Sequence, residues 1–161
     1  MTMFESSRNT PLTDIVVQYF EGEELKYSKD EYAGKPIFRI NFAGKNGNFR
    51  GIVRVNEKLF QVTVYFFLPN AIPEHKRAEA AEFITRANYG LILGNFEMDF
   101  TDGEVRYKTS TDVEGGTLTP KMVHTLFVAN LITIDRYFPG MMKVIWSDAD
   151  PEEAINEIEK D

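Results

Sequence analysis

The sequence of 161 residues contains no cysteine. This lack excludes disulfides, thiolate nucleophiles and cysteine-based zinc or iron-sulfur sites, and it fits a cytoplasmic protein. No apolar run approaches the length that crosses a bilayer. The segment MTMFESSRNTPL at the start also lacks the basic stretch and apolar run of a secretory signal. We therefore expect a cytoplasmic location and no membrane partner.

The motifs of the common enzyme classes are missing too. Neither a G-x-S-x-G nucleophile elbow, nor a P-loop, nor a G-x-G-x-x-G fingerprint occurs. His75 and His124 fall in different predicted helices without a second ligand at i+4, so we expect no metal site. Catalytic groups need not be adjacent in a sequence, so a hydrolase is kept as the lowest-ranked class. We predict no enzyme activity, no catalytic residues and no cofactor.

Positive charge is also scarce, because the formal net charge is −7. Residues 147–161 hold seven acidic side chains and one lysine, a net −6, which leaves residues 1–146 at −1. Such a layout offers no electrostatic footprint for nucleic acid. With 43% hydrophobic residues, the body is long and apolar enough to fold. We expect one domain over residues 1–146, followed by an acidic C-terminal helix or tail over residues 147–161.

Two helices are predicted in the first half of the chain. Thr10 is placed to cap a helix and Pro11 to start it, and apolar residues at helical spacing continue to residue 22. A second helix is predicted from residue 73 to about residue 88, with Gly90 as a candidate left-handed cap.

The second half predicts two more helices. Thr119 and Pro120 repeat the cap-plus-proline start for a long third helix, which Pro139 must kink or end. Asp150 begins a capping box for a short acidic helix. The carboxylates around it are better explained by the helix dipole than by calcium, because the spacing and central glycine of a calcium loop are missing.

Three strands are predicted between the first and second helices. Apolar and polar residues alternate over residues 38–42, 49–55 and 60–66, with turn residues between the runs. Residues 23–35 are polar, and a short strand around residues 25–28 is left open. We expect an antiparallel meander with one apolar and one mixed face.

A hairpin follows the second helix. Asp102 and Gly103 are typical of a two-residue type I′ turn, whose twist matches the flanking strands. That loop would set the following residues opposite each other: Phe100 and Val105, Asp99 and Arg106, Met98 and Tyr107, Glu97 and Lys108, and Phe96 and Thr109. The whole order, helix, three strands, helix, two strands, helix, predicts an α+β two-layer sandwich, with an antiparallel sheet and helices on one face.

This order and the segment ANYGLILGNFEMDFTDGEVRYKTSTDVEGGTLT resemble the YbjN-like family of bacterial proteins. The positions that match its pattern are Asn88, Gly94, Phe96, Asp99, Gly103, Tyr107 and Thr119. The resemblance runs from the first helix to about Phe138. It implies the fold of type III secretion chaperones, which are usually dimeric, and the label of a sensory transduction regulator with no established chemistry. The family pattern supplies no catalytic residues.

The sheet face opposite the helices is the candidate site. Alternation places a mixed basic and aromatic set there: Arg39, Arg50, Ile52, Arg54 and Tyr65, together with Gln61 and Thr63. A solvated face is the simpler interpretation. A surface for a peptide or protein partner is the alternative hypothesis, because arginine and tyrosine are common anchors at interfaces.

Two classes of function follow. The first is a non-enzymatic protein-binding adaptor or chaperone-like regulator, with an unidentified protein partner and a homodimeric state. The second is a sensor that binds a small ligand in the aromatic-rich interior between sheet and helices. Phe127, Leu131 and Met142 could form a helix face for a dimer, with core packing as the alternative.

Overall fold

Six strands form one antiparallel sheet in the computed structural model, which describes residues 10–160. The strands are β1 (Tyr27–Tyr32), β2 (Lys35–Ala43), β3 (Asn48–Asn56), β4 (Gln61–Phe67), β5 (Asn95–Met98) and β6 (Val105–Asp112). Their order across the sheet is β1-β2-β3-β4-β6-β5. The chain therefore leaves the meander after β4, and β6 returns to pair with β4 while β5 forms the far edge.

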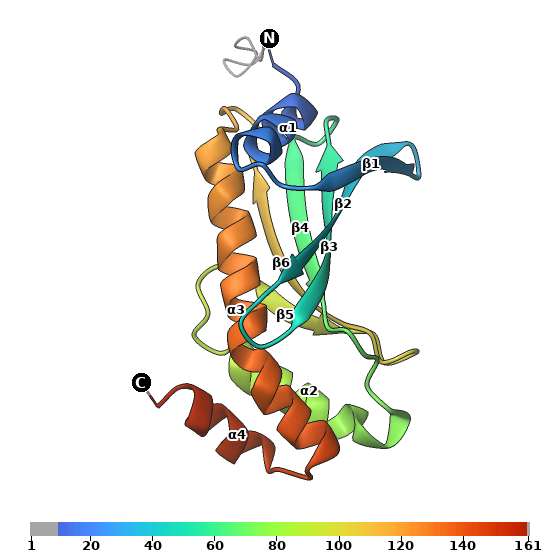
Figure 1. Cartoon of the computed structure of the whole chain (residues 1–161), viewed down its shortest axis with the longest axis vertical. Coiled ribbons are helices and arrows are strands. Elements are labelled where there is room, and N and C mark those ends of the chain that lie inside the picture. Colours follow the sequence, from blue (N-terminus) through green and yellow to red (C-terminus); the bar gives the residue numbers. More distant parts are fainter. Residues whose placement is uncertain (1–9, 161) are drawn as a thin grey trace.

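The helices are α1 (Leu12–Gly22), the short 3₁₀ helix η1 (Glu74–Lys76), α2 (Arg77–Asn88), α3 (Pro120–Trp146) and α4 (Pro151–Ile158). The helices α1 and α3 lie on one side of the sheet, and α2 and α4 pack around the end of α3 (Figure 1). The other face of the sheet carries no helix among the described residues. The predicted α+β sandwich with helices on one face is confirmed.

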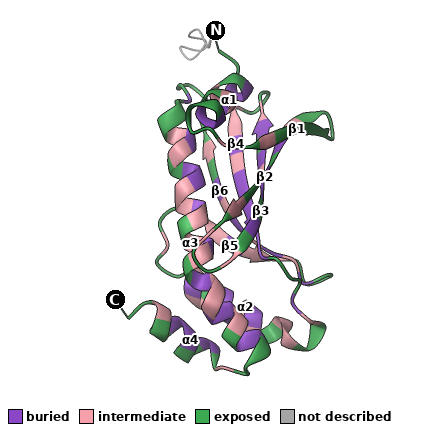
Figure 2. Cartoon of the chain, in the orientation of Figure 1, coloured by how far each residue is buried: buried purple, intermediate pink, exposed green. Residues whose placement is uncertain are grey.

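Aromatic rings fill the layer between sheet and helices. Phe20, Phe66 and Phe127 are almost fully buried, and Phe127 lies 5.2 Å from Phe66 and 6.3 Å from Phe20 between ring centres. Burial follows the strand and helix faces that meet there (Figure 2). Phe127 therefore belongs to the core, while Leu131 and Met142 pack partly buried against it.

One strand more than predicted precedes α2. The open alternative of a strand at residues 25–28 is realised as β1, two residues later and longer. Ala33 and Gly34 form the two-residue turn between β1 and β2, with φ of 51° and 73°. Both values are positive, as a type I′ turn requires. An alanine in the first turn position is not a usual hairpin signal, which explains why the sequence did not reveal this turn.

The predicted hairpin register is wrong by two residues. Phe96 pairs with Tyr107 and Glu97 with Arg106, and the loop holds the four residues 100–103. Asp99 closes this loop, since its carboxylate accepts a hydrogen bond from the Thr101 amide at 2.8 Å. A shift of two residues leaves each side chain on its own face. The predicted faces are therefore right and the predicted partners wrong.

The predicted Thr10 cap of α1 is also wrong. The helix begins at Leu12, and Pro11 in the capping position makes no side-chain bond to it. Glu57, from the turn between β3 and β4, takes over this role. Its carboxylate accepts hydrogen bonds from the Leu12 amide at 3.0 Å and the Thr13 amide at 2.8 Å. A negative charge at a helix N-terminus is favourable, so the cap comes from a distant turn.

The helix α3 starts as predicted and continues past Pro139. Thr119 Oγ1 accepts from the Met122 amide at 3.2 Å, which confirms the cap. A proline inside a helix leaves the carbonyl four residues earlier without its donor. Here that carbonyl belongs to Asp135, and Asn46 Nδ2 donates to it at 3.0 Å. The proline therefore does not end the helix, and the axis bends over its second half (Figure 1).

The acidic C-terminal segment forms α4, capped by Asp150 as predicted, with Asp150 Oδ1 accepting from the Glu153 amide at 3.1 Å. Two of its acidic residues contact side chains of α3. Lys143 Nζ lies 2.9 Å from Glu157, and the Tyr137 hydroxyl donates to Glu159 at 2.7 Å. Burial and the nearby Glu159 carboxylate raise the pKa of Tyr137 above its usual value. Part of the negative charge of this C-terminal segment is thus bound by groups of the same chain.

Candidate functional site

The candidate site is the outer face of the sheet, which we define as the face away from α1 and α3. Strand register places its side chains in rows. One row joins Arg39, Ile52 and Tyr65 across β2, β3 and β4, and continues to Lys108 on β6. The next row joins Arg50, Phe67 and Arg106. The predicted residues Arg39, Arg50, Ile52, Arg54 and Tyr65 therefore share this one face.

Three guanidinium groups stack on aromatic rings of the outer face. Arg106 lies 4.3 Å from the centre of the Tyr65 ring, and Arg54 lies 5.3 Å from the same centre. Arg54 also lies 5.4 Å from the centre of the Tyr32 ring, and Arg50 lies 4.8 Å from that of Phe67. We call Tyr32, Arg50, Arg54, Tyr65, Phe67 and Arg106 the arginine-aromatic cluster.

The arginines of the cluster shield its aromatic rings from water. Tyr65 is only 9% exposed and Phe67 only 5%, although no helix within residues 10–160 covers this face. The stacked arginines provide this cover, and each exposed cation-π contact is worth about 0.5–1 kcal/mol. A face of this kind holds its arginines in fixed positions instead of leaving them free in solvent.

Sequence reasoning missed part of the cluster. Arg106 was expected opposite Asp99 in the hairpin, and Phe67 lies just beyond the strand predicted over residues 60–66. Both belong to the site because β4 pairs with β6, with Phe67 opposite Arg106. Tyr32 belongs to the cluster because strand β1 brings its ring against Arg54. Alternation along β4 could have placed Phe67 on the outer face, but no signal in the sequence announces the β4–β6 pairing.

Carboxylates pair with most cations of this face. Arg39 lies 3.5 Å from Asp30, and Arg50 lies 3.6 Å from Glu104. Glu97 accepts from Arg106 Nε at 2.7 Å and also contacts Lys108 Nζ. The Arg39–Asp30 and Arg50–Glu104 pairs are exposed, so each contributes little to stability by itself, whereas the Glu97 pairs are partly buried.

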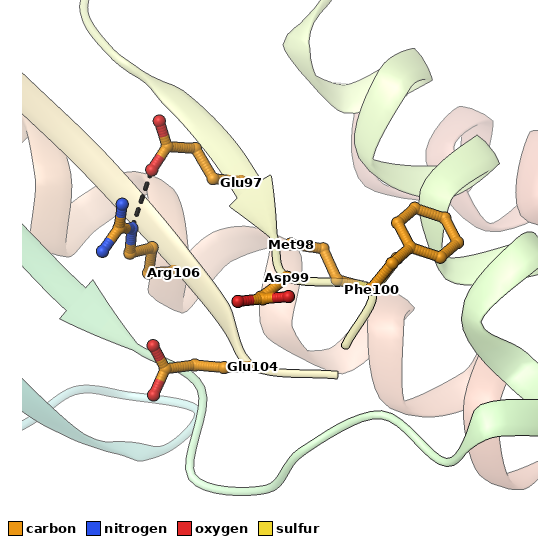
Figure 3. A pocket seen from close by; sticks show the side chains of 6 residues that line it. All are labelled: Glu97, Met98, Asp99, Phe100, Glu104 and Arg106. Atoms are coloured by element: carbon orange, nitrogen blue, oxygen red, sulfur yellow. Dashed lines mark hydrogen bonds and ion pairs between the residues drawn. The ribbon is translucent and has the colours of Figure 1, made fainter. Parts of the chain in front are cut away.

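An open hollow of about 530 Å³ lies where β5 and β6 meet their loop. Figure 3 shows Glu97, Asp99 and Glu104 around it, with Phe100 pointing away from these carboxylates. Each carboxylate already has a partner: Arg106 for Glu97, the Thr101 amide for Asp99 and Arg50 for Glu104. Hydrogen bonds from Thr101 hold the pKa of Asp99 below its usual value.

This hollow does not form a metal centre. Within residues 10–160, no group of three or more acidic, histidine or cysteine side chains is arranged to hold an ion. His75 and His124 lie on different elements, as the sequence indicated, and His124 packs 5.7 Å from the Tyr19 ring between ring centres. Burial, with a contribution from Glu23, raises the pKa of Tyr19 to about 12.

A second, smaller hollow of about 200 Å³ lies beside the β1–β2 turn, and we call it the hairpin hollow. It is lined by Tyr32, Ala33, Lys35, Ile37, Arg54, Val55, Asn56, Gln61 and Thr63. A third hollow of about 300 Å³ separates the end of α1 from the start of α3, where Tyr19, Lys121 and His124 line it.

Among residues 10–160, no helix is both long enough and apolar enough to cross a membrane.

Comparison with known proteins places this geometry in a family. The YbjN family model, described as "Putative bacterial sensory transduction regulator", matches residues 14–142. The chain belongs to the YbjN family. None of the curated proteins compared with it matches. The crystal structure of YbjN from E. coli, titled a putative transcription regulator, is similar with a TM-score of 0.55 and 11% identity.

That likeness covers 78% of this chain and 87% of the E. coli protein, and it shows a shared fold. The positions that match the YbjN pattern make structural contacts. The Asn88 side chain exchanges two hydrogen bonds with the backbone of Phe96, and the Tyr107 hydroxyl donates to the Leu93 carbonyl. A side chain at Gly94 would collide with the Lys108 carbonyl. These three positions of the pattern therefore serve the fold.

Proposed function

We propose that this YbjN-family protein is a non-enzymatic adaptor or chaperone-like regulator that binds a protein partner on the outer face of its sheet. One observation carries the proposal: the arginine-aromatic cluster lies on a sheet face that no helix covers within residues 10–160. The family is described as a regulator, which agrees with a role in binding.

The chemistry of the cluster favours a protein partner. Arginine and tyrosine are over-represented among the residues that dominate binding energies. Stacking fixes the guanidinium groups before a partner arrives, so less side-chain entropy is lost on binding. The side chain of Arg50 is 60% exposed and remains available at the surface.

The alternative, a small-ligand sensor with its site between sheet and helices, has no comparable support. Phe20, Phe38 and Phe66 fill that layer with no measurable exposure. The three hollows described above are instead at the surface.

The lack of cysteine also leads us to propose the cytoplasm as the location of the protein.

Affinity capture from cells of the source organism tests the proposal. The bait proteins are wild type, Arg50→Glu and the control Lys143→Glu. Lys143 is a matched control because its side chain is 51% exposed and has one ion pair, with Glu157, on a different surface. Arg50 is likewise exposed and paired once, with Glu104.

We expect a stoichiometric protein partner with wild type and Lys143→Glu, and its loss with Arg50→Glu. Unfolding curves of the three proteins check that each is folded. A partner that binds all three equally would place the interface elsewhere. If no protein is captured by wild type at any salt concentration, the adaptor function is wrong.

A further inference from the structure

The cations of the outer face fall into two groups. Arg39, Arg50, Arg106 and Lys108 each have a carboxylate partner within ion-pair distance. Lys35 and Arg54 have none among residues 10–160. Both of these unpaired cations line the hairpin hollow. The two cations of this face that lack a carboxylate partner among residues 10–160 therefore lie at one place, in a protein of net charge −7.

The hairpin hollow combines this charge with an apolar floor. Ile37 is 3% exposed although it lies on the outer face, so it forms the base of the hollow. The Tyr32 ring stands at one side under the Arg54 guanidinium, and Thr63 adds a hydroxyl. Gln61 donates to Asp112 at 3.1 Å.

The size of the hollow restricts what can occupy it. Pockets for whole small molecules usually measure about 300–1,000 Å³, whereas this one measures about 200 Å³. It is suited to one side chain or one terminal group. Two unpaired cations above an apolar floor favour a carboxylate on a short aliphatic stem, because the stem meets Ile37 and the oxygens meet the charges.

We propose that the hairpin hollow binds an aspartate or glutamate side chain from an acidic, extended segment of the protein partner. Arg54 is the anchoring residue and Lys35 the second cation. This inference rests on the proposed function and adds the chemistry of the partner. The rest of the segment lies along the rows of the outer face, over the arginine-aromatic cluster.

Nuclear magnetic resonance titration of the full chain tests the proposal. The probe is acetyl-Glu-Thr-Glu-Thr-Glu-Thr-amide, and the matched neutral probe has glutamine in place of each glutamate. Inorganic phosphate is titrated separately to distinguish a peptide carboxylate from a free oxyanion. The variants are Arg54→Gln, Lys35→Gln and the control Lys143→Gln, whose ammonium group is paired with Glu157 on a different surface.

We expect the glutamate probe to shift the backbone amides of Lys35, Ile37 and Thr63 in a saturable manner, and the glutamine probe to leave them unchanged. Removal of a charged partner should weaken binding about tenfold in Arg54→Gln. Lys35→Gln should weaken it less, because a flexible ammonium group makes no bidentate contact. Lys143→Gln should stay within about twofold of wild type, and added salt should weaken binding.

Arg54→Gln also loses two ring contacts, so Lys35→Gln, which has none, keeps the test independent of the cluster. Equal binding of both probes, unchanged affinity in Arg54→Gln, or no saturable shift in wild type would overturn the inference. So would inorganic phosphate that binds as tightly as the glutamate probe. If Arg50→Glu loses a cellular partner while the glutamate probe fails to bind, the adaptor function stands and only this inference is lost.

Discussion

At the scale of the residue, Ala33 adopts a left-handed conformation that costs an alanine about 1 kcal/mol or more. Its φ is 51°, in the turn that follows Tyr32 beside the hairpin hollow. Asparagine tolerates this conformation better. We expect Ala33→Asn to raise the free energy of unfolding by about 0.5–1 kcal/mol in a denaturant titration. Ala71 is exposed and has no positive φ, so Ala71→Asn should bring no gain.

Glu97 makes stability depend on pH. Partial burial raises its pKa, but hydrogen bonds from Lys108 and Arg106 outweigh this effect and hold the pKa below the usual 4.5. A lowered folded-state pKa stabilises the protein above the unfolded-state pKa, and this contribution is lost as the pH falls through the folded-state value. We expect Glu97→Gln to be less stable than wild type at pH 7, and the difference to disappear as the pH falls from about 5 to 3.

Unfolding measured at a series of pH values checks this expectation. Glu31→Gln is a suitable control, since no contact of the Glu31 side chain lies within hydrogen-bond or ion-pair distance among the described residues. Its stability difference from wild type should be small at every pH. If the difference in stability between Glu97→Gln and wild type persists at pH 3, the altered hydrogen bonding or packing of the side chain, and not the loss of its charge, causes the effect.

At the scale of the element, α3 depends on a side chain from the β2–β3 turn. Pro139 deprives the Asp135 carbonyl of its helical donor, and Asn46 replaces that donor and also bonds the Asp135 carboxylate through its backbone amide at 2.8 Å. We expect Asn46→Ala to lower the free energy of unfolding by about 1–3 kcal/mol. In a Pro139→Ala background the helix can supply its own donor, so Asn46→Ala should cost less there.

A double-mutant cycle with denaturant titrations measures this difference. The two substitutions should couple by about 0.5 kcal/mol or more, since they act on the same carbonyl. Additive effects would mean that the Asp135 carbonyl finds another donor, and that Asn46 acts through the Asp135 carboxylate alone.

Local chemistry predicted the elements that it alone determines. The Thr119 cap, the Asp150 cap and the alternating strands were recognisable because their signals lie within a few residues of one another. The cap of α1 was not, because it comes from Glu57, which is distant in the chain. The four-residue length of the hairpin loop was not predictable for a different reason. Loops of two and of four residues put the same side chains on the same faces, so the alternation pattern does not distinguish them.

At the scale of the whole molecule, the composition of the outer face was predictable and its internal arrangement was not. Alternation alone gathered Arg39, Arg50 and Arg54 on one face. The partners of these residues depend on the order of the strands. Only the pairing of β4 with β6 brings Arg106 onto Tyr65, and only β1 brings Tyr32 under Arg54. Strand order between distant segments leaves no local mark in a sequence.

The homodimer expected from the family resemblance stays a prediction, and the loop between α2 and β5 is the surface on which we expect it to form. Tyr89 is 91% exposed and Ile92 93%, and the loop is held between Gly90 and Gly94, both at positive φ. Apolar side chains so exposed in an ordered loop are typical of interfaces. We expect Ile92→Asp to lower the dimer fraction in sedimentation velocity at micromolar concentrations.

The same substitution should change the free energy of unfolding by no more than about 0.5 kcal/mol, because Ile92 packs little in the monomer. Leu59→Asp is the matched control, since Leu59 is an exposed leucine in the β3–β4 turn. It should leave the dimer intact. A wild-type protein that sediments as a monomer at every concentration removes the homodimer, whereas equal association of wild type and Ile92→Asp moves the interface away from this loop.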